Sequence, residues 1–156
     1  MDSAMPRIAA VTVERPSTLR FTWTDGEAGR ADLAGWIATG GETLAPLKNP
    51  DLFAAARIGD YGAAVAWDDG DLAIDAVHLL ELAAEQRPFG SAEAARWQQA
   101  LGLSDGEAAD FLHVPPSAWT AYKAGRSIPE AVGMLCRAAQ RDPLLLQAHY
   151  RPRRAS

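Results

Sequence analysis

One change in hydrophobic period, at residues 87–90, limits the folds that this chain can adopt. Before this segment, apolar and polar residues alternate, as around Leu19, Phe21 and Trp23, with the period of a half-buried strand. Beyond it, every segment has the apolar spacing of a helix. Strands followed by helices across a Pro/Gly break are typical of two domains. The pattern therefore predicts an α+β protein, with a small antiparallel-sheet domain over residues 1–87 and an all-α domain over residues 88–156.

The first half of the chain is expected to form strands joined by tight turns. The expected strands are Ile8–Glu14, 18–25, 27–33, 54–59 and 63–67, with turns at residues 25–26 and 68–70. A short helix is expected at 33–38 and a loop with two prolines at 44–53. Asp75 is placed to cap a helix over Ala76–Gln86, with Ala76, Leu79, Leu80 and Ala83 on one face.

The second half is expected to form five helices, each with a start signal. Their expected bounds are Ser91–Leu101, Asp105–Leu112, Pro116–Lys123, 129–139 and Pro143–His149. The clearest signal is Ser104 followed three residues later by Glu107, because this capping-box spacing satisfies two backbone N–H groups at once. Cys136 lies in an apolar helical run, which indicates a small buried thiol and excludes an internal disulfide, since it is the single cysteine.

The charge of the chain differs in sign between the halves. The formal net charge is −5, yet residues 91–156 hold eight Lys/Arg and six Asp/Glu, whereas residues 1–90 hold seven and fourteen. Basic residues thus gather toward the C-terminus, where the sequence "RPRRAS" adds a basic tail. The sequence has no N-terminal hydrophobic region and no apolar run long enough for a membrane span, so a cytoplasmic protein is expected.

Residues at the second and third predicted helices fit two short helices joined by a tight turn. Ala109 supplies the small residue that a close crossing needs, and His113 is a residue type that tolerates positive φ. Trp119 and Tyr122 are three apart and share the face that would be buried, and Gly125 ends the helix. With the helical continuation that follows, this pattern over residues 91–149 resembles the Cro/repressor-type (Xre-like) helix-turn-helix, and implies a lambda-repressor-like five-helix domain.

By that resemblance, Pro116–Lys123 is the helix that would enter a DNA groove. The residues implied at the groove or near the phosphates are Pro116, Ser117, Thr120, Ala121, Lys123, Arg126 and Ser127. Arg, Lys, Asn and Gln carry most base discrimination in the major groove, and none occupies the groove-facing positions. Asp105 stands where the family usually has a phosphate-contacting Gln, and a carboxylate there would repel phosphate. Residues 151–154 would add salt-dependent contacts, or form only a frayed tail.

The strand half resembles the bacterial domain of unknown function 2442. The resemblance rests on "TWTDGE", "PLKNPDLF" and "AVAWDDGDLAID" and covers roughly residues 7–85. That family has no established activity, so the resemblance implies a fold; fusion to a repressor-like domain and an antitoxin-like role are implied with it. Asp68, Asp69, Asp71 and Asp75 do not have the spacing of a calcium loop and are typical of turns and caps. No catalytic motif is present, and neither enzyme activity, a metal nor a cofactor is expected.

Two functions remain open from the sequence. The first is a DNA-binding, repressor-like transcriptional regulator, autoregulatory or antitoxin-like, that binds double-stranded DNA as a homodimer. Its N-terminal domain would sense or bind a protein partner, or dimerise. The second is a protein-interaction adaptor whose helix-turn-helix no longer binds DNA specifically. The basic C-terminal half favours the first, and Asp105 with the poor reading surface favours the second.

Overall fold

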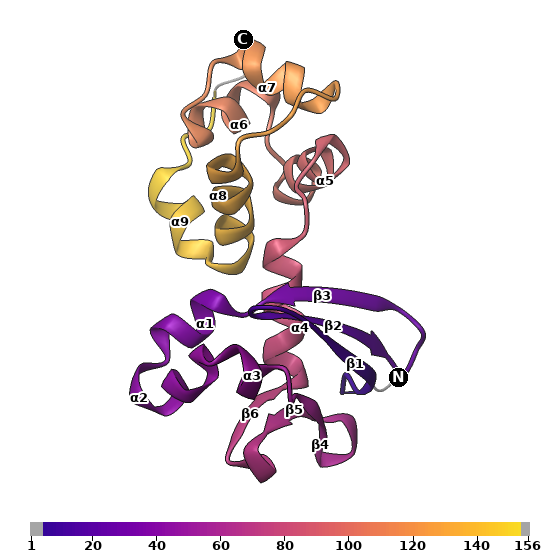
Figure 1. Cartoon of the computed structure of the whole chain (residues 1–156). Helices are drawn as coiled ribbons and strands as arrows, with labels where there is room; N and C mark the ends of the chain where they lie inside the picture. The colour runs from indigo at the N-terminus through magenta and orange to yellow at the C-terminus, as the bar shows by residue number, and fades with distance from the viewer. Residues whose placement is uncertain (1–4, 154–156) are drawn as a thin grey trace. The chain divides into compact units, whose positions relative to one another are not determined.

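The computed structural model describes residues 5–153 and contains two compact units (Figure 1). The N-terminal unit is Met1–Gln86 and the C-terminal unit is Arg87–Ser156. The first contains two three-stranded sheets with helices, and the described part of the second is helical. The expected α+β class is confirmed. No helix within residues 5–153 is long and apolar enough to cross a membrane.

The first sheet is an antiparallel meander of β1 (Ile8–Glu14), β2 (Thr18–Trp23) and β3 (Ala28–Asp32). The predicted alternation in β2 is confirmed, since Leu19, Phe21 and Trp23 are buried. The turn between β2 and β3 is closed by a hydrogen bond from the Trp23 N–H to the Glu27 carbonyl (2.7 Å). Gly26 supplies the positive φ of 93° that this turn requires.

Three short helices and one 3-10 turn connect the two sheets, and here the expected loop over 44–53 is wrong. The elements are α1 (Ala34–Thr39), α2 (Gly41–Leu44), η1 (Ala45–Lys48) and α3 (Pro50–Phe53). Pro46 and Pro50 lie in first turns, where proline removes no helical hydrogen bond. Leu44, Leu47 and Phe53 are buried, so this segment contributes to the core at the spacing of helical turns.

The second sheet is also antiparallel and is formed by β4 (Arg57–Gly59), β5 (Ala64–Trp67) and β6 (Leu72–Asp75). Its two connecting turns, η2 (Asp60–Gly62) and η3 (Asp68–Gly70), both contain residues with positive φ. The turn expected at residues 68–70 is confirmed. The alternation of Leu72 and Ile74 is too short a signal to predict β6 from sequence.

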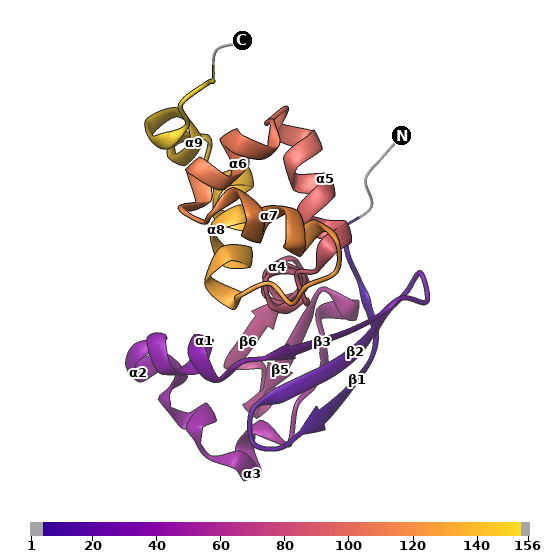
Figure 2. The same ribbon diagram turned by 90° about the horizontal axis from the view of Figure 1, so that it is seen from above.

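Helix α4 (Ala76–Gln86) runs beside β3 and β6 (Figures 1 and 2). Asp75 caps it as expected, because its Oδ1 accepts a hydrogen bond from the His78 N–H (2.8 Å). Ala76, Leu79 and Ala83 are buried, whereas Leu80 is 38% exposed. The expectation that Leu80 shares the buried face is therefore wrong, since it lies a further 100° around the helix from Leu79.

The core of the N-terminal unit joins both sheets to the helices. Its largest fully buried side chains are Trp67, Phe53, Leu19, Leu33, Leu47, Ile74, Leu79 and Val65. Trp67 packs against Phe53 with ring centroids 5.5 Å apart, and its indole N–H donates to the Phe53 carbonyl at 2.8 Å. A large aromatic side chain is thus buried with its polar atom satisfied.

The described part of the C-terminal unit consists of helices whose bounds match the expected ones, except that α8 begins one residue later and ends two residues later than the expected 129–139. They are α5 (Ser91–Leu101), α6 (Asp105–Leu112), α7 (Pro116–Lys123), α8 (Glu130–Arg141) and α9 (Pro143–His149). Helix α8 contacts α5, α6 and α9. Cys136 is fully buried, and burial raises the pKa of its thiol to about 12. The interpretation of Cys136 as a small buried group is confirmed.

Candidate nucleic-acid interface

Helix α6 begins with reciprocal hydrogen bonds between its cap and its first turn. The Ser104 hydroxyl accepts from the Glu107 N–H (3.1 Å), and the Glu107 carboxylate accepts from the Ser104 N–H (2.9 Å). This is the capping box that the spacing predicts. It fixes the residue at which α6 begins.

A three-residue turn joins α6 to α7. His113 adopts the left-handed conformation (φ 57°, ψ 42°), which confirms the expectation drawn from its residue type. The Val114 N–H donates to the Ala109 carbonyl (3.0 Å) and closes the end of α6. Pro115 and Pro116 then start α7, where their missing N–H groups need no partner.

The inner face of α7 is anchored in the core. Trp119 and Tyr122 are buried, as expected, and Ala109 of α6 is also fully buried where the two helices approach each other. The Trp119 ring meets the Trp97 ring of α5 edge-on, with centroids 5.8 Å apart. Because this face is anchored so firmly, the opposite face of α7 is held in a defined orientation toward solvent.

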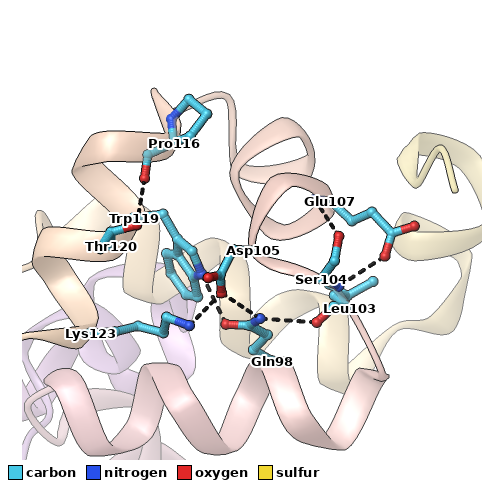
Figure 3. A network of polar contacts seen from close by, with 9 residues as sticks. All are labelled: Gln98, Leu103, Ser104, Asp105, Glu107, Pro116, Trp119, Thr120 and Lys123. Carbon is cyan, nitrogen blue, oxygen red and sulfur yellow. Dashed lines mark hydrogen bonds and ion pairs between the residues drawn. The ribbon is translucent and has the colours of Figure 1, made fainter. Parts of the chain in front are cut away.

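That opposite face and the segment just after α7 carry the residues implied by the helix-turn-helix resemblance. Pro116, Ser117, Thr120, Arg126 and Ser127 are exposed, and Ala121 and Lys123 are half-buried. The Thr120 hydroxyl donates to the Pro116 carbonyl one turn earlier (3.1 Å), as Figure 3 shows. A hydroxyl bonded in this way offers its oxygen as an acceptor, so Thr120 suits a donor group.

A polar network ties the end of α7 to the start of α6 (Figure 3). The Lys123 ammonium forms an ion pair with the Asp105 carboxylate. Gln98 of α5 donates to the same carboxylate (2.8 Å) and to the Leu103 carbonyl (3.0 Å), and accepts from the Trp119 indole N–H (3.0 Å). The hydrogen bonds from Lys123 and then Gln98 hold the pKa of Asp105 below its ordinary value. Asp105 is therefore a compensated charge within the network.

The segment after α7 presents a second basic group. Gly125, with φ 116°, ends the helix, and the Arg126 N–H donates to the Ala121 carbonyl (3.0 Å). The Arg126 guanidinium lies over the Tyr122 ring, 5.8 Å from its centroid. This contact leaves the exposed Arg126 at the end of α7, next to Ser127.

The C-terminal tail folds back onto α6. The Tyr150 hydroxyl and the Arg153 N–H both donate to the Glu107 carboxylate (3.1 and 2.7 Å). The Arg153 guanidinium forms two hydrogen bonds with the Asp110 carboxylate (2.9 and 3.0 Å). N–H donation from Ser104, then from Arg153, lowers the pKa of Glu107 to about 2, against the opposing effect of burial.

The sequence leaves two interpretations of residues 151–154, phosphate contacts or a frayed tail. Within the described residues 151–153 the structure shows no frayed tail, and the phosphate contacts stay a prediction. Arg153 is bonded to α6, and Arg151 donates to the carbonyls of Ala148 and Tyr150 (2.9 Å each). Arg154 lies outside the described residues. The basic tail thus belongs in part to the folded unit.

The exposed residues of α7 can be predicted from the sequence, whereas the side chains that connect them to the rest of the unit cannot. Gln98, Asp110 and Tyr150 have no local pattern that marks them, because their partners lie 21, 43 and 43 residues away. The sequence predicts a phosphate contact or a solvated charge at Lys123, and the structure shows its ammonium paired with the Asp105 carboxylate. A charge-pair search between predicted helices would be the available signal.

The comparisons with known proteins bear on the two halves differently. The two-unit α+β fold matches a solved structure over 100% of this chain and 99% of the other, with a TM-score of 0.50 and 24% identity. That structure is NE0471 from Nitrosomonas europaea ATCC 19718, named as a candidate DNA-binding protein. At this identity the likeness shows a shared fold alone.

A family model described as "Protein of unknown function (DUF2442)" matches residues 8–85, and the chain belongs to this family. The predicted resemblance of the strand half is confirmed. The match ends before α5, so the Cro/repressor-type resemblance of residues 91–149 stays a prediction. No curated protein matches the sequence.

Proposed function

We propose that the protein is a DNA-binding transcriptional regulator in which α6 and α7 form a helix-turn-helix and α7 enters the major groove. The observation that carries the proposal is the division of α7 into two faces. Trp119 and Tyr122 anchor one face in the core, and Pro116, Ser117 and Thr120 stand exposed on the other. A recognition helix needs this combination, because its base contacts come from the exposed residues of a rigidly held helix.

The electrostatics of α6 and α7 are compatible with a phosphate backbone. The ion pair with Lys123 compensates the Asp105 carboxylate, which as a lone charge would repel phosphate. Exposed ion pairs are weak, so a phosphate can compete for the Lys123 ammonium. Arg126 lies exposed at the end of α7. The shared fold with NE0471, named as a candidate DNA-binding protein, supports the proposal further.

The protein is proposed to read sequence through few base contacts. Ser117 and the Thr120 oxygen provide single hydrogen bonds, and the Thr120 methyl and Ala121 suit a thymine methyl. One such helix buries too little surface to be selective, so the active form is proposed to be a dimer on two half-sites about one helical turn apart. The N-terminal unit then serves dimerisation or a protein partner, and the regulated promoter is the protein's own, in a repressor-like or antitoxin-like role.

A protein-interaction adaptor is the second candidate function. The observation that favours it is that three basic side chains of this region already have partners: Lys123 with Asp105, Arg153 with Asp110, and Arg126 over an aromatic ring. Basic groups engaged in this way contribute less to a salt-dependent phosphate interface than unpaired ones.

The test is fluorescence anisotropy of the full chain with a duplex from its own upstream DNA and with a scrambled duplex, at two salt concentrations. Tighter, salt-dependent binding to the native duplex is expected. Ser117→Asp should weaken binding to the native duplex by about tenfold or more, because the new carboxylate repels phosphate. The same carboxylate stabilises the first turn of α7, so the helix itself stays folded. Arg126→Ala should weaken binding to both duplexes and flatten the salt dependence.

Gln147→Ala, an exposed change on α9, is the matched control and should leave the affinity unchanged. Equal, feeble binding of the unaltered protein to both duplexes would favour the adaptor. Native binding by Ser117→Asp would remove α7 from the interface.

A further inference from the structure

We infer that Arg153 is a positioning residue that masks the acidic charge of α6 and so lets this helix lie beside a polyanion. The inference rests on the proposed function. It concerns the tail residues Tyr150 and Arg153, which lie more than 25 residues beyond α7 in sequence yet contact α6 directly.

Helix α6 is acidic for an element beside DNA. Its eight residues contain Asp105, Glu107 and Asp110, and no basic residue. Carboxylates in the first turn stabilise a helix through its dipole, whereas Asp110 lies near the C-terminal end and gains nothing from it. Asp110 therefore needs a different partner to be tolerated there, and it is half exposed, with 51% of its side chain accessible.

Each of the three carboxylates has a donor that compensates its charge. Lys123 pairs with Asp105, and Glu107 accepts from the Tyr150 hydroxyl and from two backbone N–H groups. The Arg153 guanidinium covers Asp110 through two parallel hydrogen bonds, the strongest geometry for such a pair. Two of the three carboxylates are thus compensated by the tail.

Gly106 makes room for this arrangement. A Cβ atom at Gly106 would overlap the Arg153 guanidinium, so the missing side chain lets the guanidinium lie against the first turn of α6. The backbone N–H of Arg153 is meanwhile fixed on Glu107 at 2.7 Å, so the side chain starts from a defined point. Arg153 is held by its backbone, by its guanidinium and by the space over Gly106.

Removing the guanidinium leaves Asp110 as an uncompensated charge on the surface of α6. Its field reaches about 8 Å at physiological ionic strength, which is far enough to act on phosphates bound beside the helix. The masking contribution should therefore appear in DNA affinity and in its salt dependence, and it should depend on Asp110 rather than on Arg153 alone.

The experiment is a charge cycle in the full chain, measured as affinity for the native duplex at low and moderate salt. Arg153→Ala should weaken binding about three- to tenfold at low salt. Arg153→Lys should retain most of the affinity. Adding Asp110→Asn to Arg153→Ala should restore the affinity to within about twofold of the unaltered protein. A double variant as weak as Arg153→Ala would overturn the inference, because it would show a direct phosphate contact by Arg153.

A second experiment tests the attachment of the tail without DNA. Amide hydrogen exchange at Arg153 should be slow in the unaltered protein and several-fold faster in Glu107→Gln, which loses the charged acceptor. The Gln147→Ala control should exchange like the unaltered protein. Equal exchange in all three proteins would overturn the attachment of the tail. Failure of every variant and of the unaltered protein to bind DNA, with Arg153 still protected, would instead overturn the proposed function and with it the masking role.

Discussion

The two units each bury a tryptophan, but the indole N–H groups have different kinds of hydrogen-bond acceptor. Trp67 in the N-terminal unit and Trp119 in the C-terminal unit are both fully buried. The Trp67 indole donates to a backbone carbonyl, that of Phe53, whereas the Trp119 indole donates to the side chain of Gln98. A backbone acceptor is present whatever residue occupies position 53, but a side-chain acceptor depends on one residue.

This difference connects the core of the C-terminal unit to its surface. Gln98 contacts the buried Trp119 and the exposed Asp105, which in turn pairs with Lys123. A change at the candidate nucleic-acid interface therefore acts on the core through a short series of side chains. The unit proposed to bind DNA is thus the one whose core can be altered by a single polar substitution.

The largest effect is expected from removing the buried indoles. Trp119→Ala and Trp67→Ala should each lower the free energy of unfolding of their own unit by about 3–5 kcal/mol, because a large cavity replaces each ring. Native-state hydrogen exchange, read separately in β5 and α7, measures the effect on each unit. Loss of protection confined to the mutated unit would show that the cores are independent, and equal loss in both units would contradict that separation.

The sharpest test of the comparison is at the acceptor. Gln98→Ala should destabilise the C-terminal unit by about 1–3 kcal/mol, since it leaves the buried Trp119 N–H without its partner. The neighbouring change Gln99→Ala, at an exposed position, is the control and should stay within about 0.5 kcal/mol. Urea unfolding, monitored through the hydrogen exchange of the α7 amides, distinguishes Gln98→Ala from Gln99→Ala. A Gln98→Ala protein as stable as its control would mean that the indole finds another acceptor.

The helix caps should behave alike in the two units. Ser104→Ala removes one bond of the capping box of α6, and Asp75→Ala removes the cap of α4. Each should lower the free energy of unfolding by about 1 kcal/mol. Thermal unfolding of both variants beside the unaltered protein gives the comparison. A much larger loss for Ser104→Ala would show that the cap also holds the tail through Glu107.

The smallest expected effect is the loss of stability that protonation of Glu107 causes in acid. The carboxyl of Glu107 has a pKa of about 2 in the folded protein, below its ordinary value of 4.5. Its contribution to stability is therefore complete above about pH 4.5 and is lost as the pH falls toward 2. The unfolding of α6, followed by hydrogen exchange, should become easier over that range, and less so in Glu107→Gln. Parallel pH profiles for the two proteins would contradict the assignment to Glu107.

Much of the fold could be predicted because its signals are local. The bounds of α6 and α7 follow from a capping box, a pair of prolines and a residue suited to positive φ, all within a few residues of the elements they define. The segment at 44–53 could not be predicted in this way. Its prolines are equally compatible with a loop and with first helical turns, and burial of Leu47 and Phe53 in the core decides between them.

Part of the candidate interface could likewise be predicted from local signals, and part could not. Residues of α7 that face solvent could be chosen from the sequence, because Trp119 and Tyr122 mark the opposite face by their spacing. The ion-pair partners of the charged residues could not be predicted from the sequence, because a long charged side chain can reach several oppositely charged groups. From the sequence, Asp105 is expected to repel phosphate, whereas in the structure Lys123 forms an ion pair with it.

The strand and helix periods, the helix starts, the left-handed residue His113 and the buried aromatic anchors all follow from the sequence. The contacts of Gln98 with Trp119, of Lys123 with Asp105 and of Arg153 with Asp110 are visible only in the folded protein. The physical reason is range. Periods and caps are set by backbone geometry within one or two turns, whereas these pairings join residues 18 to 43 positions apart and exist only once the packed helices bring them together.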